Sequence, residues 1–204
     1  MDKKLYKRYI ENFDINLLDC RPLGGGHNGI VYLLPEGKVI KICYEANSCK
    51  KEYDILKRIK RNNYFPRVYG MVGNYMIRDY VDGITLSKHI KHYGFDKKLA
   101  VNLMELLEEF KRLDFKKQDI RCKDIMIQPD GRLMVIDPKK FYSKKRDFPK
   151  HLSKGLYRLG VLDTFMSMVR EEKPHLYRQW YSKVNDYICK KHIEYDSMKK
   201  DCIR

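Results

Sequence analysis

Three aspartates between residues 119 and 137 could act together on a charged substrate. Asp119 and Asp124 border a short polar loop, and Asp137 directly follows an apolar stretch. The turn sequence Pro-Asp-Gly at 129–131 lies between two apolar stretches, which is typical of a tight hairpin. A hairpin brings its ends together, so we expect the three carboxylates to converge. Clustered carboxylates repel one another unless a cation or a proton lies between them, and oxygen ligands favour magnesium.

A second group of residues could bind phosphate. Gly24, Gly26 and Gly29 form the pattern G-x-G-x-x-G. Glycine allows the backbone to approach a phosphate closely and to donate N–H groups to it. The apolar stretch 30–34 predicts that a strand follows the glycines, whereas a helix follows them in a dinucleotide-binding fold. We therefore expect a hairpin that covers phosphates; the alternative is a glycine-rich turn without a ligand.

One lysine and one glutamate occur where an isolated charge would be unfavourable. Lys41 lies inside the apolar strand predicted for 38–43, and Glu52 lies on the apolar stripe of the helix predicted for 46–61. Because burial of either charge alone is costly, we expect the two side chains to pair. The alternatives are an edge-strand lysine that faces water and a surface glutamate that pairs within its own helix.

The elements that must position these residues change in type along the chain. Before residue 82 the sequence predicts five strands and one helix, and beyond the Asp82-Gly83 break it predicts mainly helices. The predicted strands cover 16–23, 30–34, 38–43, 65–73 and 74–81. The predicted helices of the second half cover 86–92, 99–113, 156–169 and 176–193. The fold class predicted from this order is α+β.

Composition limits the classes of protein and partner. The 204 residues carry a formal net charge of +16, which favours an acidic partner or nucleic acid, or else a lysine-rich surface that faces water. Without a nucleic-acid-binding motif, the solvated surface is the favoured interpretation. From the sequence we expect no transmembrane segment and no signal peptide. Six cysteines without C-x-x-C spacing predict reduced thiols in a cytoplasmic protein.

Taken in order, these features are a glycine-rich loop, a strand lysine, a helix glutamate, a hinge, the pattern D-x-x-x-x-(N/D) and a strand that ends in aspartate. This set resembles the protein kinase-like superfamily, and more closely its trimmed RIO-type and small bacterial Ser/Thr protein kinases. The resemblance covers roughly residues 18–165. It implies a two-lobed kinase-like fold in a single domain, 1–204. An antiparallel five-stranded N-lobe with one helix would span about 1–81, and a reduced, mainly helical C-lobe about 82–204.

The resemblance also implies a role for each candidate residue. The residues that would bind ATP are Gly24, Gly26 and Gly29 over the phosphates, Lys41 on the α- and β-phosphates, Glu52 as the anchor of Lys41, and the backbone from Asp79 to Val81 against adenine. The residues that would act in transfer are Asp119 as catalytic base, Arg121 on the transferred phosphate, and Asp124 and Asp137 as ligands of Mg²⁺.

The activity that follows from the resemblance is ATP- and Mg²⁺-dependent phosphoryl transfer, with a serine or threonine of a protein substrate as the favoured acceptor. The sequence departs from the family pattern at Lys117-Gln118, which replace His-Arg, at Asp124, which replaces asparagine, and at Pro138-Lys139, which replace Phe-Gly. It also lacks an A-P-E motif. Two alternatives therefore stay open: a small-molecule kinase for sugars, choline or aminoglycosides, and a nucleotide-binding pseudokinase that acts as a binding module.

Overall fold

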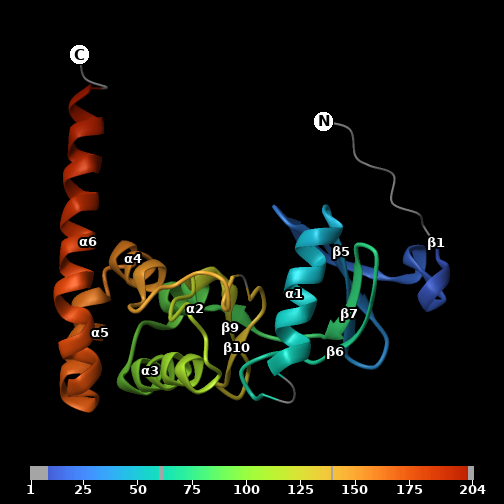
Figure 1. Cartoon of the computed structure of the whole chain (residues 1–204), viewed down its shortest axis with the longest axis horizontal. Coiled ribbons are helices and arrows are strands. Elements are labelled where there is room, and N and C mark those ends of the chain that lie inside the picture. The colour runs from blue at the N-terminus through green and yellow to red at the C-terminus, as the bar shows by residue number, and fades with distance from the viewer. Residues whose placement is uncertain (1–8, 60–61, 139, 202–204) are drawn as a thin grey trace. The chain divides into compact units, whose positions relative to one another are not determined.

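The computed structural model describes the backbone of residues 9–59, 62–138 and 140–201 (Figure 1). Contacts within the chain divide it into two compact units, and each is described by itself. The first contains Met1–Val81 and Asp137–Lys139, and the second contains Asp82–Ile136 and Lys140–Arg204. The main boundary therefore lies at the Asp82-Gly83 break, where the sequence pattern changes from strands to helices.

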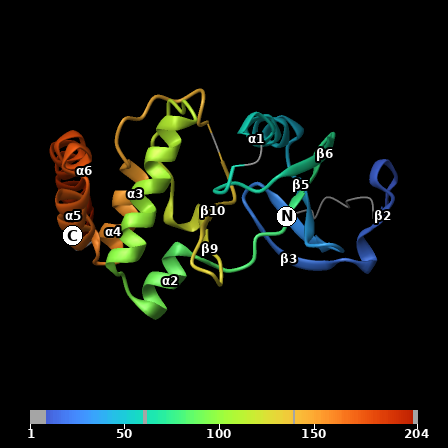
Figure 2. The same cartoon turned by 90° about the horizontal axis from the view of Figure 1, so that it is seen from below.

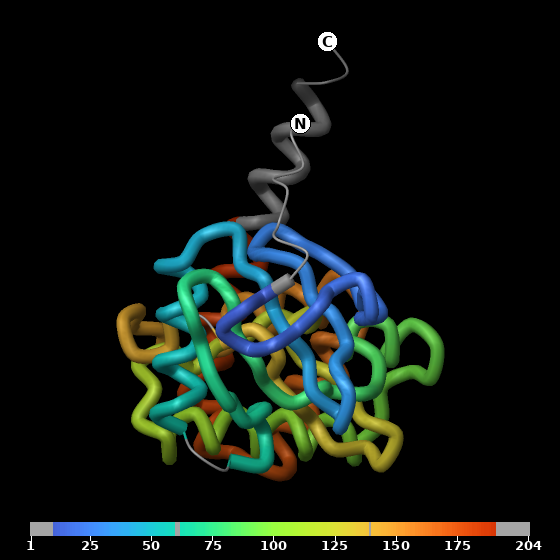
Figure 3. The backbone as a smooth tube through the Cα atoms, turned by 90° about the vertical axis from the view of Figure 1, so that its right-hand side faces the viewer, coloured from blue at the N-terminus to red at the C-terminus, as the bar shows by residue number. Residues whose placement is uncertain are grey.

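The first unit is built around an antiparallel sheet, whose successive turns run from blue to teal in Figure 3. Its strands are β3 (Arg21–Gly26), β4 (Gly29–Leu34), β5 (Lys38–Cys43), β6 (Val68–Val72) and β7 (Tyr75–Asp79). The strand order is β3-β4-β5-β7-β6, so β5 has a partner on each side. This arrangement confirms the predicted α+β class and the predicted five-stranded antiparallel sheet.

The two faces of this sheet are covered by different segments. Helix α1 (Ala46–Ile59) lies beside the strands (Figure 1) and buries a stripe that includes Cys49, Glu52 and Leu56. On β5, alternation directs Ile40 and Ile42 into a separate apolar cluster with residues of the N-terminal segment. The Lys41 side of β5 is therefore the side that faces α1.

The N-terminal segment differs from its prediction. A continuous strand was expected over 16–23, but the described residues form β1 (Tyr9–Ile10), β2 (Ile15–Asn16) and a 3₁₀ turn at Leu17–Asp19 before β3 begins. The Asn16 side chain accepts a hydrogen bond from the Leu18 backbone N–H, and this local bond favours a turn over a strand. Leu17 then packs against the sheet.

The second unit is mainly helical. Its helices are α2 (Leu86–Tyr93), α3 (Lys97–Arg112), α4 (Lys150–Arg158), α5 (Leu162–Glu172) and α6 (Pro174–Asp201). A small antiparallel sheet contains β8 (Ile84–Thr85), β9 (Ile125–Ile127) and β10 (Leu133–Val135). Helix α5 contacts both α3 and α6 (Figure 2), and Phe165 and Trp180 are fully buried in this core.

The single helix predicted over 156–169 is wrong, because two helices cover this stretch. Helix α4 ends at Arg158, and Gly160 adopts a φ of 73°, which a residue with a side chain rarely adopts. Helix α5 then starts at Leu162. Among the helices that the structure describes, none is both long and apolar enough to cross a membrane.

Candidate functional site

Lys41 lies at the centre of a charged cluster in the first unit. Its ammonium group forms an ion pair with Oε2 of Glu52, which joins β5 to α1. Lys41 is only 6% exposed and Glu52 only 3% exposed. An ion pair so well shielded from water is much more strongly coupled than a surface pair, and loss of either partner leaves a buried charge. The pairing expected from the sequence is thus present.

Asp137 joins the same cluster although it lies 96 residues further along the chain than Lys41. Its Oδ1 atom is 3.7 Å from the Lys41 Nζ atom. Its Oδ2 atom accepts a hydrogen bond of 3.3 Å from the side-chain amide of Asn28, the residue before Gly29. Lys41 therefore lies between two carboxylates, and one of them is tied to the glycine-rich hairpin.

Opposing influences act on Glu52 within the first unit. Burial raises the pKa of Glu52, whereas the positive charges of Lys41 and the buried Arg78 oppose this rise. The negative charge of Asp137 acts in the same direction as burial and favours the protonated form of Glu52.

The glycine-rich segment forms the β3–β4 hairpin. At Gly29 an added Cβ atom would lie 2.0 Å from the carbonyl oxygen of Ile42, so only glycine allows β4 to approach β5 this closely. Gly24 and Gly26 are exposed in β3, and a Cβ atom at either position would meet nothing within 4 Å. The open space beside these two glycines is consistent with a surface that covers a ligand.

The predicted adenine-binding segment ends the first unit. The Asp79 backbone N–H donates to the Arg67 carbonyl, and the Tyr80 N–H donates to the Gly37 carbonyl. The Asp79 carboxylate accepts hydrogen bonds from the Arg67 backbone N–H and the Tyr69 hydroxyl. These bonds hold the segment in an extended form, and Val81 at its end is buried.

Asp119 has a different environment, in the second unit. Its side chain is completely buried, with 0% exposure. One carboxylate oxygen accepts from the backbone N–H groups of His151 and Leu152, at 2.7 and 3.3 Å, and the other oxygen contacts the His151 ring at Nδ1. Those two N–H groups lie in the first turn of α4, where Pro149 supplies no side-chain cap. Asp119 therefore caps α4 from a distant part of the chain.

Asp124 and Arg121 lie near Asp119 in sequence but are held differently. Nε of Arg121 is 3.5 Å from the Asp124 carboxylate, and the Arg121 side chain is half-exposed. The Asp124 carbonyl accepts from the Ile136 backbone N–H, which ties the loop to the end of β10. The ammonium of Lys117, whose pKa is lowered by burial, lies within electrostatic range of Asp119, Arg121 and Asp124.

Sequence reasoning missed several residues of these clusters. Asn28, Arg78 and His151 contact or influence the predicted site residues, but none of them had been singled out. The sequence could have indicated Arg78, because an arginine inside an apolar strand, like Lys41, needs a partner for its charge. For Asn28 and His151 the sequence held no signal, because their partners lie 109 and 32 residues away.

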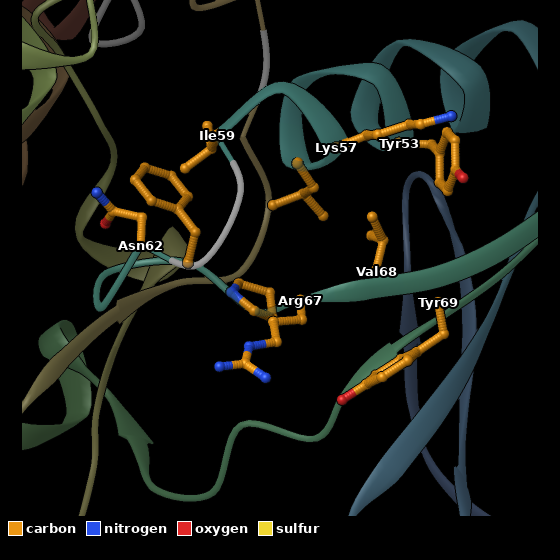
Figure 4. A pocket seen from close by; sticks show the side chains of 10 residues that line it. Tyr53, Lys57, Ile59, Asn62, Arg67, Val68 and Tyr69 are labelled. Carbon is orange, nitrogen blue, oxygen red and sulfur yellow. The ribbon is translucent and has the colours of Figure 1, made fainter.

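A pocket of about 400 Å³ lies elsewhere in the first unit, along α1 and the segment that leads into β6 (Figure 4). Its lining combines apolar side chains such as Leu56 and Val68 with two cations, Lys57 and Arg67. Lys57 lies over the ring of Tyr53 at 5.6 Å. None of the predicted site residues lines this pocket, so it is separate from the charged cluster around Lys41.

Within the described parts of the chain, no three or more His, Cys, Asp or Glu side chains form a group able to hold a metal ion. Comparison of the sequence with protein-family models and with curated proteins gave no match.

Proposed function

We propose that this chain is an ATP- and Mg²⁺-dependent phosphotransferase of the protein kinase-like superfamily, with a serine or threonine of a protein as acceptor. One observation carries the proposal: buried Lys41 lies between Glu52 and Asp137, and Asp137 is bonded to the glycine-rich hairpin through Asn28. The architecture is compatible with it, because a five-stranded antiparallel sheet with one helix precedes a mainly helical unit.

The nucleotide would bind through its charged end. The Lys41 ammonium is held rigidly by Glu52 and can bind phosphate oxygens without first being ordered, which reduces the entropic cost of binding. The β3–β4 hairpin, with open space beside Gly24 and Gly26, would cover the phosphates with backbone N–H groups. The backbone near Val81 would meet adenine.

The residues present fit magnesium. Asp137 is a partly exposed carboxylate beside Lys41, and by the resemblance Asp124 would be the second ligand. Magnesium binds through one or two carboxylates together with substrate phosphates and water, so no preformed cage of three side chains is required. When bound, the ion would neutralise phosphate charge and so offset the repulsion between the phosphates and the Asp137 carboxylate.

Transfer to a hydroxyl group requires a base, and by the resemblance Asp119 has that role. Its carboxylate now accepts from the first turn of α4 and from the His151 ring. To receive the proton of an acceptor hydroxyl, one oxygen has to leave the His151 ring and turn outwards. By the resemblance, the half-exposed Arg121 would contact the transferred phosphate.

Transfer of radiolabelled γ-phosphate from ATP, to the chain itself and to dephosphorylated casein, tests the proposal. We expect magnesium-dependent incorporation that is lost in Asp137→Asn. The matched control is Asp130→Asn, because Asp130 is an exposed turn residue that pairs with nearby Arg132. Equal incorporation in Asp137→Asn and wild type, or none in wild type, would contradict the proposed activity.

A second candidate function is a nucleotide-binding module that transfers nothing. The specific observation that favours it is the complete burial of Asp119, whose carboxylate is occupied by α4. The two candidates differ in outcome, because a module would bind a non-hydrolysable Mg·ATP analogue through Lys41 and still give no radiolabel on any acceptor.

A further inference from the structure

The Asp119 carboxylate is buried, but the histidine ring that it contacts is not. The Asp119 side chain is 0% exposed, whereas the His151 side chain is 38% exposed. The ring contacts Oδ2 of Asp119 through Nδ1, and within the described parts of the chain its Nε2 atom has no hydrogen-bond partner. A hydroxyl group that arrives from solvent can therefore contact the His151 ring without any rearrangement, whereas it cannot contact Asp119.

The contact with Asp119 sets the tautomer of the His151 ring. An ionised carboxylate only accepts hydrogen bonds, so Nδ1 is the nitrogen that carries the hydrogen. The lone pair of the neutral ring then lies on Nε2. A buried carboxylate bound to Nδ1 also stabilises the imidazolium ion that forms when Nε2 takes up a proton. Asp119 and His151 thus have the arrangement of an orienting carboxylate and an imidazole base.

Helix α4 is fixed against the loop that carries Asp119, and this fixes the position of His151 in its first turn. The Asp119 carboxylate accepts from the backbone N–H groups of His151 and Leu152. The Cys122 thiol donates to the Leu152 carbonyl, with 3.9 Å between sulfur and oxygen. A Cβ atom at Gly155 would lie 2.4 Å from the same sulfur, so only glycine lets α4 approach the loop this closely. Catalysis by the ring therefore needs little further ordering.

We propose that His151 removes the proton from the acceptor hydroxyl and that Asp119 is its positioning residue; this role rests on the proposed function. Nε2 accepts the proton as the O–H bond breaks, and the hydroxyl oxygen forms a bond to the γ-phosphorus of ATP. The bond between that phosphorus and the bridging oxygen breaks, and its electron pair leaves with ADP. The imidazolium ion then releases its proton to water. Asp119 stays ionised and bonded to α4 throughout, so no oxygen of Asp119 has to turn outwards.

The tautomer of His151 can be tested without ATP. Two-bond ¹H–¹⁵N correlation spectra of the full-length chain report which ring nitrogen carries the hydrogen, and the His151 signals are assigned by their absence from His151→Ala. We expect the neutral ring to carry its hydrogen on Nδ1. In Asp119→Asn we expect the other tautomer, because the asparagine NH₂ group donates to Nδ1. A wild-type ring with its hydrogen on Nε2, or one that stays doubly protonated wherever the protein is active, would overturn the proposal.

Transfer of radiolabelled phosphate by His151→Ala, with and without added imidazole, tests the catalytic role. The variant keeps the backbone N–H that Asp119 accepts from, so we expect it to fold, which circular dichroism verifies. We expect kcat to fall by roughly 100-fold or more, with little change in the KM for ATP. Added imidazoles should restore part of kcat, and more basic imidazoles should restore more. The matched control is His92→Ala, an exposed histidine of α2, which we expect to act like the wild type.

The dependence on basicity separates a catalytic role from a structural one, because a ring that only supports α4 would be replaced equally well by any imidazole that fits. Loss of transfer that no imidazole restores would therefore overturn the role of His151. If Asp119 instead receives the proton directly, removal of the ring frees its oxygen, and His151→Ala should transfer phosphate as fast as the wild type or faster. That result would overturn the role of His151 and leave the proposed function in place, whereas no transfer by the wild type would overturn both.

Discussion

The two units each bury a carboxylate that sequence patterns associate with catalysis, but they neutralise it in different ways. In the first unit Glu52 is matched by the ammonium group of another side chain, Lys41, which in the proposed function also binds phosphate. In the second unit Asp119 accepts hydrogen bonds from two backbone N–H groups at the start of α4 and contacts the His151 ring. The comparison indicates that the first cluster carries its positive charge on a side chain that could also bind a ligand. Asp119, in contrast, holds the start of α4 through one oxygen, which leaves the oxygen at His151 for the proposed role as base.

The largest effect is expected from Asp119→Ala. The substitution leaves the backbone N–H groups of His151 and Leu152 buried without this acceptor, so we expect the free energy of unfolding to fall by about 3–5 kcal/mol. Urea unfolding followed by the fluorescence of Trp180, the one tryptophan of the chain and a core residue of this unit, measures it.

Asp119→Asn provides the matched comparison. Its amide oxygen can still accept from α4, and its NH₂ group can donate to Nδ1 of the other His151 tautomer, so we expect a loss of only about 1–2 kcal/mol. If Asp119→Ala were as stable as the wild type, the capping role of Asp119 would be wrong.

A smaller loss of stability is expected from Lys41→Met. Glu52 is left buried, but it can take up a proton and still lies in the field of Arg78, so we expect about 2 kcal/mol of destabilisation at neutral pH. The loss should shrink as the pH falls, because protonation removes the charge that Lys41 had balanced. Urea unfolding followed by circular dichroism at several pH values measures this, and a loss that is independent of pH would contradict the buried ion pair.

For Asp137→Asn we expect a change in binding and little change in stability. Asparagine keeps a side-chain oxygen that can accept from the Asn28 amide, so the free energy of unfolding should change by only about 1 kcal/mol. Affinity for a non-hydrolysable ATP analogue should fall at least roughly tenfold with magnesium present, since a metal ligand is lost. With EDTA the variant should bind ATP as tightly as the wild type, or more tightly, because a negative charge near the phosphates is gone. An unchanged affinity in magnesium would exclude Asp137 as a metal ligand.

The smallest effect concerns the surface of the second unit. Lys183 hydrogen-bonds Asp147 and thereby lowers the pKa of that carboxyl group. The pair therefore contributes stability above the usual titration range of aspartate, and the contribution is lost as the pH falls through the lowered pKa. Because both side chains are largely exposed, we expect no more than about 0.5 kcal/mol. Thermal melts of Lys183→Ala and wild type should differ slightly at pH 7 and converge in acid.

Local patterns in the sequence predicted much of the first unit. Alternation on β5 separated Lys41 from Ile40 and Ile42, and the apolar stripe of α1 identified Glu52 as buried. The break between α4 and α5 was missed because the apolar stripe continues across Gly160, and periodicity alone does not report a residue with positive φ.

The roles of the carboxylates could be predicted less well. Asp119 carries the same sequence signal whether its carboxylate faces a substrate or caps α4, because the N–H groups that it accepts from lie 32 and 33 residues later. The pairing of Lys41 with Asp137 followed from the order of motifs, whereas the Asn28 contact depends on the geometry of the hairpin turn.

Calorimetric titration of Mg·AMP-PNP into wild type, Lys41→Met and Lys57→Met tests the central claim most directly. Lys57 is an exposed lysine on the same helix as Glu52 and contacts Tyr53, so it controls for the loss of one positive charge. We predict saturable binding to wild type and Lys57→Met and none to Lys41→Met. Equal binding by all three proteins, or no binding by the wild type, would contradict the assignment of Lys41, Glu52 and Asp137 to a nucleotide site.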